Sequence, residues 1–153
     1  MTITNHILAG SIIGLAVSNP VLAIVLAFVS HFAMDVLPHF GYEGKNGYVV
    51  FKHKLMRIVS VATFVSSLIV VIFLTATGNW FALFTGLIAA SPDALGFYNY
   101  LKHERKELPS TGVIGVFHVK FHRYIQWCER PWGVAVEVTV SILLFWLLVR
   151  MVV

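Results

Sequence analysis

Long apolar runs separated by short polar segments dominate the chain. The runs predict five membrane helices, at approximately Ile3–Val17, Pro20–Leu37, Leu55–Thr77, Asn79–Lys102 and Trp132–Val153. The first two runs are short for a bilayer span, which needs about 20 residues. We therefore expect an all-α fold, a polytopic membrane bundle that forms a single domain over residues 1–153.

Two tight turns divide the apolar runs into hairpins. Ser18-Asn19-Pro20 separates the first pair, with Pro20 suited to the first turn of the following helix. Thr77-Gly78-Asn79 separates the third run from the fourth. A further segment, Val116–Glu129, mixes aromatic and basic residues too freely to span a membrane. This segment predicts an amphipathic helix at the membrane interface.

Composition and charge support the membrane assignment and orient the bundle. Hydrophobic residues make up 58% of the chain and charged residues 12%. Of the 11 Lys and Arg residues, all except Arg150 fall on one side of the expected topology. Basic residues favour cytoplasmic loops, so we expect a multi-pass inner-membrane protein with a cytoplasmic N-terminus and an external C-terminus. This topology already explains the net charge of +4, which therefore gives little support to nucleic-acid binding.

A few ionisable side chains interrupt the apolar runs. An ionisable group in hydrocarbon costs roughly 3 kcal/mol, so such a residue indicates a functional site with a partner. A helix rises about 1.5 Å per residue, which allows each position to be measured from the outer turns. The count gives one common depth, roughly 17–23 Å from those turns, for four residues: His6, His31, Asp35 and Asp93. We expect their side chains to converge near the cytoplasmic face.

Histidine and carboxylate ligands favour zinc, and also suit manganese and iron, whereas the single cysteine excludes a thiolate cluster. His118 and His122, spaced one helical turn apart on the interfacial helix, point the same way, so either could reach the site. Ser91-Pro92 directly before Asp93 can start or kink a helix. We expect a divalent metal, with zinc favoured, and a ligand set drawn from His6, His31, Asp35, Asp93, His118 and His122.

A structural interpretation of the same residues remains open. His31 and Asp35 could form a buried pair that joins two helices, and His118 and His122 could contact lipid headgroups. The common depth of the candidate ligands favours a functional site.

Three other residues carry separate expectations. His39 follows Pro38 in a loop, a position that favours a solvent-exposed ring. Glu137, near the start of the last helix, could support a ligating histidine or pair with an arginine. Cys128 cannot form an internal disulfide and is expected to pack at an interface.

Short segments of this chain resemble the motifs of small bacterial membrane-bound metal-dependent hydrolases, a family whose ligand set is similar to that of zinc-dependent phospholipase C. The segments are Asn5–Gly10, Ser30–Asp35 with Pro38-His39, and Pro92-Asp93. The resemblance implies that the metal ligands are His6, His31, Asp35 and Asp93, completed by His118 or His122.

We therefore expect hydrolysis of a phosphoester, with a phospholipid among the candidate substrates, at the cytoplasmic face of the membrane. A bound metal lowers the pKa of water and polarises a phosphoryl oxygen. Asp35 or Asp93 would orient or deprotonate the water when not fully used as a ligand. Lys120 and Arg123 would hold the phosphate.

Two other classes of function use the same residues. The first is a metal-binding or transport protein without hydrolase activity. A carrier needs access from both sides of the membrane, whereas the candidate ligands share one face. The second is a structural or partner-binding membrane protein whose polar pairs only join helices.

Overall fold

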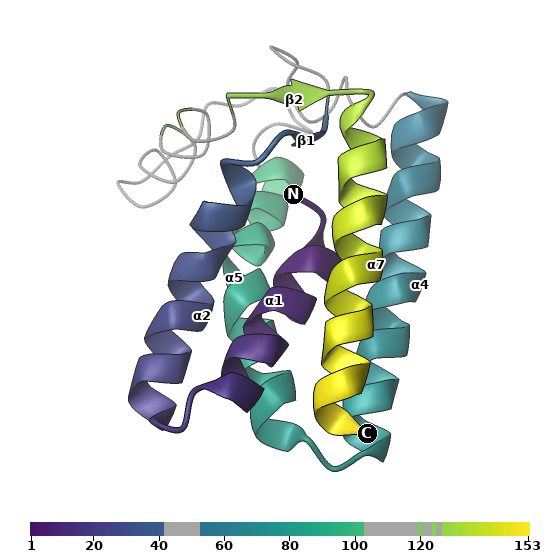
Figure 1. The fold of residues 1–153 in the computed structure, drawn as a ribbon. Coiled ribbons are helices and arrows are strands. Elements are labelled where there is room, and N and C mark those ends of the chain that lie inside the picture. The colour runs from purple at the N-terminus through teal and green to yellow at the C-terminus, as the bar shows by residue number, and fades with distance from the viewer. Residues whose placement is uncertain (42–52, 103–119, 121–123, 125–126) are drawn as a thin grey trace.

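The computed structural model describes residues 1–41, 53–102, 120, 124 and 127–153, with side chains described for all of these except 95–102 (Figure 1). The described residues form five helices and two short strands. The helices are α1 (Ile3–Ala16), α2 (Pro20–Asp35), α4 (Lys54–Ala76), α5 (Trp80–Lys102) and α7 (Gly133–Val152), and the strands are β1 (His39–Phe40) and β2 (Glu129–Arg130). The all-α expectation is confirmed, and each helix ends within two residues of its predicted bounds.

Local chemistry explains both tight turns. The Asn19 side chain accepts a hydrogen bond from the Leu22 N–H at 3.1 Å, which caps α2, and Pro20 occupies the first helical turn as expected. Gly78, between α4 and α5, has a φ of +73°, a left-handed conformation that glycine adopts without a steric penalty. Each turn therefore joins two antiparallel helices.

Membrane-spanning length is reached by fewer helices than the sequence predicts. Among the described residues, α4 and α7 are long and apolar enough to cross a membrane by length and composition. The apolar helices α1 and α2 have only 14 and 16 residues, about 21 and 24 Å at the helical rise, against a hydrocarbon core of about 30 Å. Two candidate spans are therefore found in place of about five.

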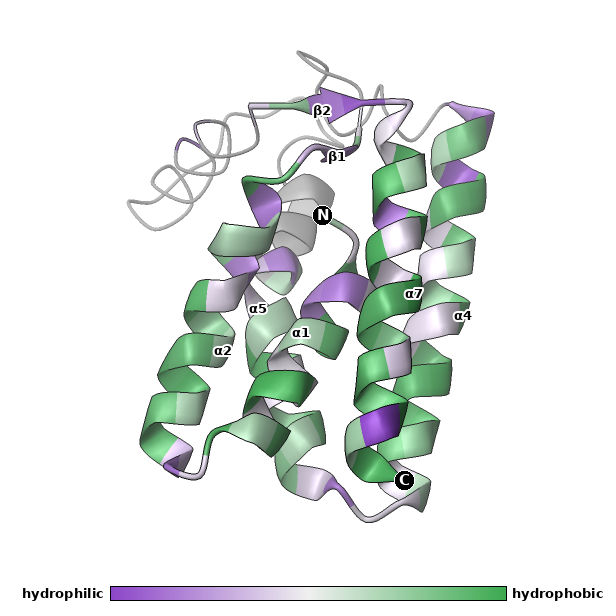
Figure 2. Ribbon diagram, viewed as in Figure 1, coloured by the Kyte–Doolittle hydropathy of each residue, from purple (hydrophilic) through white to green (hydrophobic). Residues whose placement is uncertain are grey.

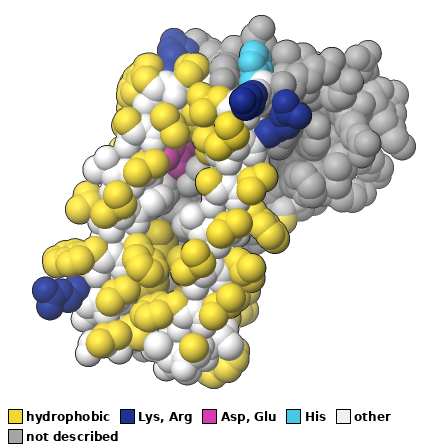
Figure 3. Space-filling view, turned by 90° about the vertical axis from the view of Figure 1, so that its right-hand side faces the viewer, with side chains coloured by type: hydrophobic (Ala, Val, Ile, Leu, Met, Phe, Trp, Pro, Cys, Tyr) yellow, Lys and Arg dark blue, Asp and Glu magenta, His cyan; other side chains and the backbone are white. Residues whose placement is uncertain are grey.

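The outer surface of the bundle is apolar over most of its length. Large side chains such as Phe64, Val61 and Ile142 are 70%, 64% and 63% exposed. Hydrophobic residues follow the helices from end to end in Figure 2, and in Figure 3 the Lys and Arg side chains lie toward the two ends of the apolar face. A soluble monomer rarely exposes an apolar surface of this extent, so the surface supports association with a membrane.

Small residues bring α1 and α5 unusually close together. A Cβ on Gly10 would meet Ala89 and the Thr85 carbonyl, and a Cβ on Gly86 would lie 2.8 Å from the Ile7 carbonyl oxygen. Gly10 begins a Gly-x-x-x-Gly motif of the kind that packs membrane helices, a signal absent from the expectations above. The two helices are antiparallel, so a step toward the N-terminus of α1 matches a step toward the C-terminus of α5. His6 and Asp93 therefore lie one helical turn beyond the contact between Gly10 and Ala89.

The strands join the end of α2 to the start of α7. They pair in parallel, with His39 opposite Glu129. The Trp127 indole N–H donates to the Val36 carbonyl at 2.9 Å, which adds a second tie. The interfacial-helix prediction for Val116–Glu129 lies largely outside the described residues, but its last residue belongs to β2, so that bound is wrong.

The expectation of a solvent-exposed His39 is also wrong, because its ring is only 3% exposed. Its Nδ1 atom lies 2.8 Å from the Leu37 carbonyl oxygen, and Nε2 lies 3.7 Å from Glu129 Oε1. Strand pairing buries this ring, and a two-residue strand leaves almost no signal in the sequence.

Candidate metal centre

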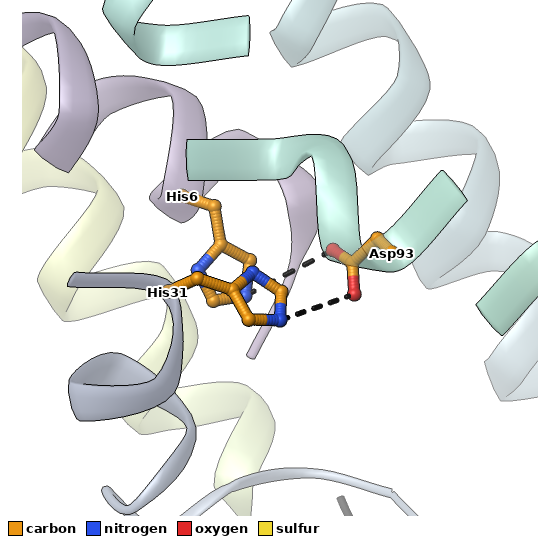
Figure 4. A group of neighbouring side chains, drawn as sticks. All are labelled: His6, His31 and Asp93. Carbon is orange, nitrogen blue, oxygen red and sulfur yellow. Dashed lines mark ion pairs between the residues drawn. The ribbon is translucent and has the colours of Figure 1, made fainter. Parts of the chain in front are cut away.

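Three helices bring the four predicted side chains to one place. His6 comes from the first turns of α1, His31 and Asp35 from the last turns of α2, and Asp93 from α5. Figure 4 shows His6 and His31 lying together, with the Asp93 carboxylate facing both rings. The side chains of His6, His31 and Asp35 are 0% exposed and that of Asp93 is 30% exposed. The predicted convergence is confirmed, while the role of these residues as ligands stays a prediction.

Both carboxylates approach the same two imidazole nitrogens. The Nε2 atom of His6 lies 3.2 Å from Asp35 Oδ1 and 3.9 Å from Asp93 Oδ2. The Nε2 atom of His31 lies 3.4 Å from Asp35 Oδ2 and 3.9 Å from Asp93 Oδ1. Two nitrogens and two carboxylates therefore surround one small volume.

A backbone carbonyl of α5, close to Pro92, orients the His31 ring. Pro92 has no N–H to donate to the Ile88 carbonyl one turn earlier, and the Ser91 hydroxyl donates to that carbonyl instead, at 2.8 Å. The next carbonyl, of Ala89, lies 2.9 Å from His31 Nδ1. Since a carbonyl can only accept, Nδ1 is the donor in this contact, and Nε2 is the ring nitrogen that faces the carboxylates. The helix runs through Pro92, so a helix start at Ser91 is excluded.

His6 is held differently from His31. Its ring stacks on that of His31, with centroids 4.0 Å apart and an angle of 29° between the planes. Among the described residues, neither ring nitrogen of His6 has a hydrogen-bond partner, although Nε2 lies close to both carboxylates. A buried imidazole nitrogen in this position is available as a ligand.

The donor set fits a divalent metal ion. One donor atom each from His6, His31 and Asp93 lies within 4.8 Å of the others. Ligand bonds of about 2.0–2.2 Å in a tetrahedral site separate donor atoms by about 3.3–3.6 Å, and the nitrogen–oxygen distances of 3.2–3.9 Å bracket that range. Nitrogen and carboxylate oxygen are the donors that zinc accepts.

The two carboxylates differ in their surroundings. Asp35 Oδ1 also contacts the α-amino group of Met1, and Asp35 is the closer carboxylate to both histidines. Asp93 lies farther from the rings and retains an exposed edge. Like charges in one buried volume repel each other, so a cation among them stabilises the arrangement, and the α-ammonium group of Met1 already lies against Asp35.

The other predicted site residues have separate outcomes. His118, His122 and Arg123 lie outside the described residues. Lys120 is described and is exposed. Glu137 is buried, yet among the described residues it pairs with neither a histidine nor an arginine, and instead accepts hydrogen bonds from α1.

The fold and the cluster define a helical protein with two candidate membrane spans and a candidate histidine–aspartate metal centre. No protein-family model, curated protein or solved structure matches the chain. Functional interpretation therefore rests on the geometry of the cluster.

Proposed function

We propose that this protein is a membrane-bound, metal-dependent hydrolase that acts on a phosphoester, with a phospholipid among the candidate substrates and zinc as the favoured metal. The observation that carries the proposal is the approach of two imidazole Nε2 atoms and two carboxylates to one volume, between helices of a bundle with an apolar outer surface. Ionisable groups placed so deeply among apolar residues are typical of functional sites. The resemblance to membrane-bound metal-dependent hydrolases gives the same assignment.

Each residue has a distinct role in this proposal. His6 and His31 hold the metal through Nε2, with the His31 ring fixed by Ala89. Asp35, fully buried, completes the ligand set on the inner side. When bound, the metal supplies a polarised phosphoryl oxygen and a more acidic water. Asp93 accepts the proton of the attacking water, because it alone of the four retains an exposed edge toward incoming substrate.

The segment before β2 supplies the remaining roles in this proposal. His118 or His122 adds a further nitrogen, and Lys120 and Arg123 hold the phosphate.

Phosphoester hydrolysis is tested on the purified protein in lipid nanodiscs loaded with Zn²⁺. We expect release of phosphate or of a phosphorylated headgroup from phospholipid, loss of this release with a chelator, and its return on adding Zn²⁺. The Asp93→Asn variant is expected to lose at least about 100-fold in rate, the contribution of a general base. His53→Ala changes an exposed histidine outside the cluster and serves as the control.

The outcomes separate the three classes of function. Tight metal binding without hydrolysis of any phosphoester would leave a metal-binding or transport protein. Absence of metal binding would leave a structural or partner-binding protein, in which these side chains only form polar contacts between segments. The contact between Met1 and Asp35 is one such contact.

The proposal includes a membrane-embedded helical bundle with the metal centre toward the cytoplasm. In a Cys128→Ser background, Lys54→Cys and Ala76→Cys place a thiol at opposite ends of α4. We expect a membrane-impermeant maleimide to label only the Ala76→Cys variant in spheroplasts, because basic residues favour the cytoplasmic side. Both variants should be labelled after lysis. Labelling of the Lys54→Cys variant alone would show the opposite orientation and contradict this part of the proposal.

A further inference from the structure

His6 and His31 are positioned by different means. The His31 ring is fixed by its hydrogen bond to the Ala89 carbonyl. The buried Nδ1 of His6 has no such partner among the described residues. A ligating histidine ordinarily donates its second nitrogen to a group that orients the ring. The direction of the His6 ring therefore depends on its stacking against His31 and on the placement of the first turn of α1.

The first turn of α1 has no cap of its own. Thr2, at the N-cap, makes no side-chain capping bond, and the first turn contains no acidic residue. The carboxylate of Glu137, on α7, acts as the cap instead. Its Oε2 atom accepts hydrogen bonds from the Thr2 backbone N–H at 2.9 Å and from Asn5 Nδ2 at 3.0 Å. A carboxylate at a helix N-terminus also interacts favourably with the helix dipole.

Asn5 connects this cap to the metal centre. The residue is fully buried and immediately precedes His6. Its Nδ2 group also donates to the Glu137 backbone carbonyl at 3.2 Å, and its Oδ1 accepts from the Ser141 hydroxyl at 2.6 Å. These three hydrogen bonds of the Asn5 side chain are all with α7, and they fix the register and rotation of the turn that carries His6.

We propose that Glu137 is a positioning residue for the metal centre, acting through Asn5 to hold His6 in its ligating orientation. The inference rests on the metal centre proposed above. It gives the buried acidic residue of a candidate membrane span a specific role, since an ionised side chain at this position is costly without one.

Three substitutions separate positioning from charge and from fold stability. Glu137→Ala removes both hydrogen bonds to α1, and we expect the dissociation constant for Zn²⁺ to rise about 10-fold. The ligand-field absorption of bound Co²⁺, which reports coordination geometry, should change with it. Glu137→Gln keeps an oxygen that can accept both bonds, so its affinity should stay within about 3-fold of wild type. Thr139→Val, an exposed position on the same helix, is the control.

A double-mutant cycle tests the route through Asn5. We expect Asn5→Ala to weaken Zn²⁺ binding as much as Glu137→Ala does, and the double variant to be no weaker than either alone. Equal losses in Glu137→Ala and Glu137→Gln would show a long-range charge effect and overturn the inference. Reduced stability with unchanged affinity and Co²⁺ spectrum would also overturn it, while leaving the metal centre in place. Failure of the wild-type protein to bind Zn²⁺ would overturn both proposals.

Discussion

Replacing His31 with alanine is expected to lower the affinity for Zn²⁺ by more than about 100-fold, since loss of a group that only orients a ligand already costs 10–100-fold. The His31 Nε2 atom faces both carboxylates of the cluster, and its Nδ1 atom is tied to Ala89, so no neighbouring side chain reproduces its position. Elemental analysis of the purified protein and competition with a chelator measure the effect. Phosphoester hydrolysis should disappear in the same variant.

A loss of metal caused by unfolding needs to be distinguished from the loss of a ligand. His31→Gln keeps a polar side chain of similar length, and circular dichroism reports whether the helices persist. His53→Ala removes an exposed histidine and should retain full metal content. Metal content equal to wild type in a folded His31→Ala protein would contradict the proposed centre.

Replacing Gly86 with leucine is expected to destabilise the bundle by about 3 kcal/mol or more, at the upper end of overpacking effects. A Cβ at this position would lie 2.8 Å from the Ile7 carbonyl oxygen, and backbone cannot move aside as a flexible side chain can. α1 and α5 must then separate. Because the same interface carries His6 and Asp93, metal binding should fall with stability. Thermal unfolding followed by circular dichroism measures the first effect.

The control for this substitution places the same side chain where space is available. Ala62 lies on an exposed face of α4, and Ala62→Leu should change stability by less than about 0.5 kcal/mol. A Gly86→Leu protein as stable as Ala62→Leu would show that the close approach of α1 and α5 is not required.

Helix positions and the depth of the candidate ligands follow from local properties of the sequence. Apolar run length, Asn19-Pro20 and Gly78 mark the helix ends, because caps and turns depend on neighbouring residues only. The constant rise of a helix then converts sequence separation into depth, which is why His6, His31, Asp35 and Asp93 could be expected at one level. Whether helices span a membrane is less predictable, since α1 and α2 are apolar but short.

The partners of each side chain required the tertiary structure. Depth does not give the direction in which a side chain points, so the sequence left Glu137 between two roles, and only the fold shows that its carboxylate contacts Thr2 and Asn5. The Gly10-x-x-x-Gly14 motif was the available signal for close helix packing, but it does not identify α5 as the partner. The two-residue strands that bury His39 are too short for any periodicity to reveal.

The sequence by itself determined an all-α apolar bundle and the level at which its ionisable residues lie, because both depend on the local rise and composition of single helices. Only the tertiary structure decided which helices meet, that Ala89 orients His31, and that Asp35 is enclosed while Asp93 keeps an exposed edge. These differences arise from packing between segments distant in the chain, where the rotation of each helix about its axis is set by its neighbours.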